Sequence, residues 1–257
     1  MNPILAGFLA SLLAGLATFV GALPVFLPIR LTQRLQAIAL GFGAGVMLAA
    51  TSFSLIVPGK DAAISQGASQ IKAALIMGVG VLLGTAFLGL SNKYLPHEHF
   101  YKGPEGVNTQ HLRRIWLFIL AITIHNFPEG LAVGVNFGAG NPSQGIPLAI
   151  GIGLQNIPEG LVVAVSLLAE GYSSLYAVGI SLLTGLVEPV GGLLGAGVVA
   201  IAQPLLPWGM AFAAGAMLFV ISDEIIPESH RQGREQEGTI GVMIGFVVMM
   251  LLDIGLG

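Results

Sequence analysis

Two short segments of the chain combine polar side chains with a proline in otherwise apolar surroundings. Residues 125–130 read HNFPEG and residues 155–160 read QNIPEG. In a helix, positions three or four apart share a face, so the first two side chains of each segment would lie beside its glutamate. Imidazole, carboxylate and amide oxygens are suitable ligands for divalent transition metals. The repeated pattern therefore predicts a metal site shared by two helices, with these candidate ligands: His125, Asn126, Glu129, Gln155, Asn156 and Glu159.

The prolines of the two segments indicate where the backbone is interrupted. Pro128 and Pro158 cannot donate a backbone hydrogen bond, which frees the carbonyls of Ile124 and Leu154 and kinks each helix. Irregular backbone deep in a membrane is tolerated where it lines a cavity or is buried in protein. Paired, interrupted helices at corresponding positions are typical of a transporter's binding site.

A third carboxylate, Glu188, precedes Pro189 in another apolar stretch. Three close carboxylates in a low dielectric cannot all stay ionised alone, and one or two divalent cations would balance them. The chain contains no cysteine, so the site is moderately hard and disfavours a dedicated Cu(I) carrier. The alternative is that these residues join helices through buried hydrogen bonds.

Composition identifies the elements that must position these side chains. Only 9% of the 257 residues are charged and 54% are hydrophobic, whereas soluble domains carry about 25% charged residues. We expect an all-α integral membrane protein, a single domain over residues 1–257, with about eight transmembrane helices and kinks in the fourth and fifth. The predicted spans are 3–27, 35–57, 71–91, 115–137, 146–169, 175–201, 205–226 and 239–256.

The distribution of Lys and Arg predicts the orientation. The odd-numbered connections carry most of the ten basic residues, so the positive-inside rule places both termini outside the cytoplasm. The connection 92–114 would then be a cytoplasmic loop, whose His97 and His99 either collect metal or are incidental. No basic tract exceeds two residues, which argues against nucleic acid as a partner.

With these motifs the chain resembles the ZIP family of divalent-metal transporters, in its bacterial GufA-type branch. The resemblance also covers Glu188-Pro189, the GVM at 45–47 and the DEIIPE at 223–228. It implies an eight-helix bundle with a two-metal site in which Glu129 and Glu159 bridge. The first position would use Met47, His125, Glu129, Gln155 and Glu159. The second would use Asn126, Glu129, Asn156, Glu159 and Glu188.

The resemblance also implies the substrate and its route. Family members like this chain favour Zn²⁺ and Cd²⁺, with Fe²⁺ or Mn²⁺ in others, and no catalytic cofactor is implied. We expect transport towards the cytoplasm in the cell inner membrane. The resemblance implies a rocking or elevator motion of a helix group, and homodimers also occur in the family. Many relatives have His at Gln155, and some have a carboxylate at Asn156. These departures weaken the first position and put a stable second metal in doubt.

Several polar residues could form an accessory pathway. Ser54 lies seven residues after Met47 on the same face, so it either lines the outer approach or bonds to its own helix. The predicted cytoplasmic end of the seventh span carries four more polar side chains, which either receive the metal on exit or are solvated. These four are Asp223, Glu224, Glu228 and His230.

Two other functions use the same buried groups. A proton- or sodium-coupled cation exchanger would need the carboxylates but no metal preference. An intramembrane metalloenzyme is disfavoured, because H-E-x-x-H is absent and only His125 lies in a span. No nucleotide-binding P-loop occurs, so direct coupling to ATP is not expected, and we expect the protein not to be an enzyme.

Overall fold

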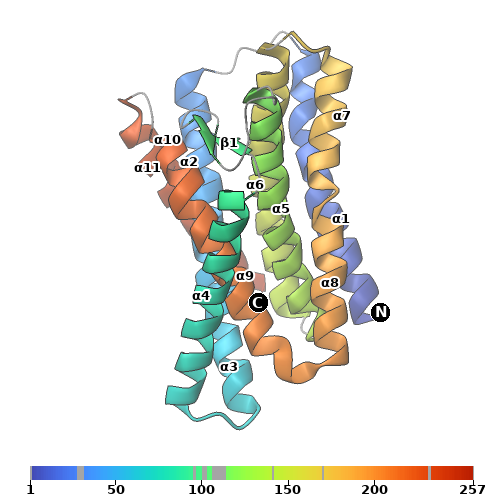
Figure 1. Ribbon diagram of the computed structural model, residues 1–257, viewed down its shortest axis with the longest axis vertical. Coiled ribbons are helices and arrows are strands. Elements are labelled where there is room, and N and C mark those ends of the chain that lie inside the picture. Colours follow the sequence, from blue (N-terminus) through green and yellow to red (C-terminus); the bar gives the residue numbers. More distant parts are fainter. Residues whose placement is uncertain are drawn as a thin grey trace.

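The computed structural model describes residues 2–27, 32–94, 97–99, 103–105, 114–140, 142–169, 171–230 and 233–256. In these residues the chain is almost entirely helical and forms an elongated bundle (Figure 1). The first half contains α1 (Pro3–Ala22), η1 (Leu23–Phe26), α2 (Gln33–Ala49), η2 (Ala50–Ile56), α3 (Val57–Ser65), α4 (Gln70–Tyr94) and α5 (Arg114–Gly138). The second half contains α6 (Pro142–Ala169), α7 (Ser174–Gly185), α8 (Glu188–Ile201), η4 (Gln203–Leu205), α9 (Leu206–Val220), η5 (Ile221–Ile225), α10 (Ile226–Ser229) and α11 (Glu235–Leu256).

These elements confirm the all-α membrane fold. Seven helical segments of the described chain are long and apolar enough to cross a membrane, and α5, with 25 residues, has a similar length. Large apolar side chains face outwards, including Leu13, Ile71 and Ile201, which are 69%, 76% and 87% exposed. Such a surface is stable only in contact with lipid, because a soluble protein would have to shield it from water. The protein is therefore a multi-pass membrane protein.

Local sequence signals define several helix ends. The side chains of Asn2, Thr32 and Ser173 accept hydrogen bonds from backbone N–H groups at the starts of α1, α2 and α7. Pro128 lies inside α5, and Pro158 lies inside α6. The predicted sixth span is divided into α7 and α8. The second and seventh spans each contain a π-helical segment, η2 and η5.

A small hairpin is the one departure from an all-helical chain in the described residues. Strands β1 (His97–His99) and β2 (Gly103–Glu105) pair antiparallel, with His97 opposite Glu105. They lie within the predicted loop 92–114, and β1 contacts α5. The side chains of His97 and His99 lie outside the described part of the structure.

The helices divide into two groups by their close contacts. The site bundle consists of α1, α5, α6, α7 and α8, on the right of Figure 1, and the support group consists of α2, α3, α4, α9 and α11, on the left. In the support group α2 packs on α11 and α4 packs on α9. The two groups meet where α6 contacts α2 and α11 and where α5 contacts α9. The candidate ligands lie mainly in the site bundle.

Candidate metal centre

Helices α5 and α6 bury the polar residues of the two proline segments. Asn126 and Glu129 on α5 and Asn156 on α6 have no exposed surface, while Gln155 and Glu159 are 2% and 8% exposed. His125 occupies a helical position on α5, but its side chain lies outside the described part of the structure. The spacing thus places the two motifs on buried faces, as expected for side chains three or four residues apart.

Hydrogen bonds between amides and carboxylates join three helices at this point. The Gln155 Nε2 donates to Glu129 Oε1 and links α6 to α5. The Asn156 Nδ2 donates to Glu188 Oε1 at 2.6 Å and to the Ala14 carbonyl at 2.9 Å, which links α6 to α8 and α1. The two adjacent amides of α6 therefore each hold a carboxylate of a different helix.

The position of Glu188 is set by a break in the helix of the predicted sixth span. It is the first residue of α8, directly after Leu186 and Val187 interrupt the helical run of α7. Its side chain is wholly buried, and Glu129 and Glu159 are near enough for their charges to act on it directly. The break was not predicted from sequence, although the Glu-Pro pair is typical of the first turn of a new helix.

The glycine that ends each motif allows these helices to approach closely. A Cβ on Gly130 would lie 2.6 Å from the Cα of Glu188, and a Cβ on Gly160 would lie 2.7 Å from the carbonyl carbon of Thr18. Small residues permit such backbone contacts between membrane helices. Gly130 thus seats α8 against α5, and Gly160 seats α1 against α6. The sequence pattern included both glycines, but this role was not assigned to them.

Several buried polar atoms at the centre have no hydrogen-bond partner among the described residues. They are both side-chain polar atoms of Asn126, the Gln155 Oε1, the Asn156 Oδ1 and the Glu188 Oε2. Buried polar groups are normally satisfied, so such a cluster calls for an explanation. All but one of these atoms are oxygens, the donor type that a divalent cation accepts.

No Lys or Arg side chain from this part of the sequence balances the negative charge of the buried carboxylates. The sequence contains no Lys or Arg between Arg114 and Arg231, the whole stretch that forms α5 to α10 apart from its first residue. Three carboxylates, those of Glu129, Glu159 and Glu188, are therefore buried in a segment without a permanent cation. A carboxylate in a membrane interior is costly and marks a functional site or a paired group.

Met47 lies on the neighbouring helix of the support group. It is 1% exposed, and Gly43, one turn earlier, faces Gln155, with its ideal Cβ position 3.6 Å from Gln155 Cγ. Helix α2 thus passes α6 beside the polar centre. Among the described side chains, no three His, Asp or Glu residues are grouped closely enough to hold a metal. The described centre is held by amide–carboxylate pairs.

Ser54 makes a contact that the sequence did not predict. Its hydroxyl, wholly buried in η2, donates to Asp253 Oδ1 of α11 at 2.6 Å. The alternative in which this hydroxyl bonds to its own helix is wrong, because the bond joins η2 to α11. Asp253 had no assigned role, although a single carboxylate late in the last span indicates a partner. The role of Ser54 in an approach path stays a prediction.

The residues of the predicted exit lie at the opposite end of the support group. Asp223 and Glu224 are partly buried in η5, Glu228 is partly buried in α10, and His230 Nε2 lies 3.3 Å from Thr239 Oγ1. A hollow of about 330 Å³ beside them is lined by Thr85, Leu218, Phe219, Ser222 and Asp223. These acidic groups are therefore neither deeply buried nor part of the centre on α5 and α6.

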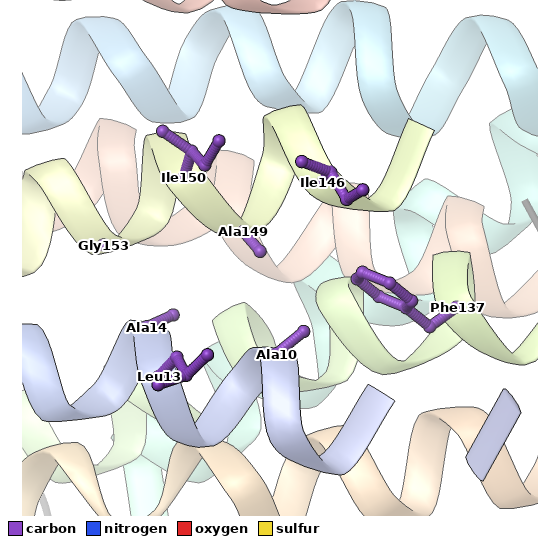
Figure 2. A pocket seen from close by; sticks show the side chains of 8 residues that line it. All are labelled: Ala10, Leu13, Ala14, Phe137, Ile146, Ala149, Ile150 and Gly153. Carbon is purple, nitrogen blue, oxygen red and sulfur yellow. The ribbon is translucent and has the colours of Figure 1, made fainter. Parts of the chain in front are cut away.

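A second hollow, also of about 330 Å³, lies between α1, α6 and the end of α5. Figure 2 shows its lining, in which every labelled side chain is apolar. Leu13, Ile146 and Ile150 are partly exposed there, so the hollow opens to the lipid-facing surface. It offers no ligand for an ion and is distinct from the polar centre.

A multi-span membrane protein with buried acidic and amide side chains on paired proline-containing helices has the architecture of an ion transporter. Residues 92–253 match the family described as ZIP zinc transporter. The chain is 51% identical to the zinc transporter GufA of Myxococcus xanthus, over 98% of this chain and 99% of that protein. It is 46% identical to the zinc transporter ZIPB of Bordetella bronchiseptica, over 94% of this chain and 78% of that protein. It is 35% identical to human zinc transporter ZIP11, over 93% and 94%. The chain belongs to the ZIP family and is GufA-like.

Proposed function

We propose that this protein carries divalent transition-metal ions, Zn²⁺ first among them, across the membrane towards the cytoplasm. The observation that supports this most directly is the burial of Glu129, Glu159 and Glu188 within a chain segment that lacks Lys and Arg. Two of these carboxylates, Glu129 and Glu188, are held by the adjacent amides Gln155 and Asn156. A mobile dication can balance these charges where no protein cation does. Zinc is also the metal named in each of the relatives described above.

The amides would make binding reversible. Gln155 and Asn156 donate to carboxylates, while their own side-chain oxygens accept no hydrogen bond from the described residues. When a metal reaches the carboxylates, each amide can turn and offer its oxygen instead of its N–H group. A neutral amide is a weak ligand, and conduction requires binding that is weak enough for release.

We propose the ligand sets implied by the family for the two metal positions. Met47, His125, Glu129, Gln155 and Glu159 would form the first position. Asn126, Glu129, Asn156, Glu159 and Glu188 would form the second. In the described state Asn156 is already held by Glu188 and by the carbonyl of Ala14, so the second position is expected to bind metal more weakly. The ion is a transported substrate, and the protein would act without catalytic chemistry.

The two helix groups suggest how the ion changes sides. Most candidate ligands lie in the site bundle, whereas Met47 lies in the support group. Displacement of the site bundle along the support group would carry the carboxylates past Met47 from one side to the other. We place the protein in the cell inner membrane with both termini outside the cytoplasm, on the basis of its basic connections. A homodimer is part of the same proposal.

The test is Zn²⁺ uptake by proteoliposomes containing wild type, Glu129→Gln, Glu188→Gln or Glu235→Gln. Glu129→Gln removes a charge from the proposed centre with little change of shape, and uptake should fall to the level of empty liposomes. Glu188→Gln should keep part of the activity if the second position is auxiliary. Glu235, exposed at the start of α11, is the matched control and should transport normally.

Other outcomes separate the alternative functions. If wild type moved no divalent metal above empty liposomes, the proposal would fail. Uptake of Na⁺ or H⁺ that depends on Glu129 but not on His125 would then identify a cation exchanger. A metalloenzyme would support no flux of metal in liposomes that contain only lipid and this protein.

A further inference from the structure

A short sequence repeats in the second and seventh spans. Residues 44–48 read AGVML and residues 214–218 read AGAML. The correspondence continues, because Ser52 follows Met47 by five positions and Ser222 follows Met217 by five. Seven positions after each methionine stands a polar residue, Ser54 in one copy and Glu224 in the other.

The backbone repeats with the sequence. The π-helical η2 begins three residues after Met47, and the π-helical η5 begins four residues after Met217. A proline, Pro58 or Pro227, follows close behind each π-helical segment. π-helical turns are rare and are frequently found at functional sites. The two copies therefore share an unusual local backbone structure as well as a similar five-residue sequence.

The packing of the two copies also corresponds. Gly45 is seated against the backbone of Val242 on α11, and Gly215 is seated against the backbone of Val81 on α4. Each methionine lies two residues after its glycine, about 200° around the helix. Met47 and Met217 are thus turned away from the peripheral helices α11 and α4. They are 1% and 0% exposed and belong to one buried cluster.

Helices α2 and α9 both lie in the support group and run in opposite directions (Figure 1). Helix α2 contacts α6, while α9 contacts α5, so each copy adjoins one of the two motif helices. The π-helical segment follows the methionine in both copies. The π-helical segment therefore lies towards the predicted outer side of the membrane after α2, and towards the predicted cytoplasmic side after α9. Met217 is the inverted counterpart of Met47.

We infer that Met217 is a second thioether contact for the transported metal, on the cytoplasmic side of the centre. This inference rests on the proposed transport function and on Met47 as a ligand. A thioether is a neutral, soft donor that can hold an ion weakly while it leaves the carboxylates. Glu224, seven residues further along the chain in η5, would receive the ion next. The outer copy has the hydroxyl of Ser54 at the corresponding place.

The test compares Cd²⁺ and Zn²⁺ uptake by the same proteoliposomes. Cd²⁺ is the softer ion, so loss of a thioether should reduce its transport more than that of Zn²⁺. The variants are Met217→Leu, Met47→Leu and, as a control, Met249→Leu, whose methionine is equally buried but lies on α11. Met→Leu nearly conserves volume, and the ratio of the two fluxes cancels differences in the amount of folded protein.

We expect the ratio of Cd²⁺ to Zn²⁺ uptake to fall roughly three- to tenfold in Met217→Leu and in Met47→Leu. Met249→Leu should keep the wild-type ratio. An unchanged ratio in Met217→Leu, or an equal fall in Met249→Leu, would overturn the inference while leaving Zn²⁺ transport intact. If Met217→Leu moved neither ion, competition of Cd²⁺ and Zn²⁺ for the purified variant would give the same ratio at equilibrium. A wild type that moves neither ion would instead refute the proposed function.

Discussion

Within the site bundle and within the support group, helices pack through glycines against backbone. Between the two groups, the glycines contact side chains instead. Within each group, glycines seat one helix on the backbone of another, as Gly130 does against Glu188 and Gly215 against Val81. Where the groups meet, the described glycines face side chains only. Gly43 faces Gln155, Gly151 faces Met249 and Val46, and Gly209 faces Val135.

This difference has a mechanical consequence. A backbone contact is fixed by the helix and cannot yield, whereas the end of a Met or Val side chain can change rotamer. Packed helices joined at glycines should therefore move as units, and the boundary between the groups should be the surface that slides. On the proposed mechanism, the same glycine-rich sequence would provide two rigid groups of helices and one deformable interface between them.

The largest loss of stability is expected from a substitution inside the site bundle. In Gly130→Ala the added Cβ would lie 2.6 Å from the Cα of Glu188, which cannot move without displacing α8. We expect a loss of about 3 kcal/mol in the free energy of unfolding, at the upper end of overpacking costs. Denaturant titration of the purified protein in detergent would measure it.

The matched control for that change is Gly197→Ala. Gly197 lies on α8, and nothing comes within 4 Å of the position of its Cβ. Alanine there should be neutral or stabilising by up to about 1 kcal/mol, since it favours the helix. Equal stability of the two variants would show that the backbone contact at Gly130 is not a constraint.

The sequence predicted the spans and the polar centre because both depend on residue type and spacing. Long apolar runs reveal the helices, and the pattern around Pro128 and Pro158 indicates which faces carry buried polar side chains. The partners of those side chains depend on how distant helices pack. The pairing of Asn156 with Glu188, the break before Glu188 and the bond from Ser54 to Asp253 could not be read from local sequence.

The support group has its own polar link, and removing it should have a medium effect. Ser54 Oγ donates to Asp253 Oδ1 at 2.6 Å and joins η2 to α11. In a double-mutant cycle of Ser54→Ala and Asp253→Leu, we expect a coupling of about 1–2 kcal/mol in the free energy of unfolding. Replacing both partners should cost less than the sum of the two single changes. Additive effects would mean that the bond does not stabilise this group.

Two glycines of α9 test the boundary itself. The ideal Cβ of Gly209 lies 3.3 Å from Val135 Cγ2 in the site bundle, whereas that of Gly215 lies 2.7 Å from the carbonyl carbon of Val81 in the support group. Gly209→Ala should change the free energy of unfolding by less than about 1 kcal/mol, because Val135 can turn aside. It should slow Zn²⁺ uptake, since the added methyl group protrudes into the proposed sliding surface between the two groups. Gly215→Ala should instead lose stability, and the reverse result would contradict the division into two bodies.

The smallest effect is expected at the surface of the support group. Arg34 Nε lies 3.6 Å from Glu237 Oε1 and links α2 to α11, but the Arg34 side chain is 71% exposed. An exposed ion pair of this kind contributes 0 to about 1 kcal/mol, and Glu237 keeps a second partner in Arg234 at 3.2 Å. Arg34→Ala should therefore lower the free energy of unfolding by less than about 0.5 kcal/mol. Lys60→Ala, which removes the exposed pair of Lys60 Nζ with Asp61 Oδ1 at 2.8 Å, should have a similarly small effect. Gly41 and Gly45 of α2 lie against the backbone of Gly238 and Val242 of α11. A larger loss would show that charge, and not these glycine contacts, holds α2 against α11.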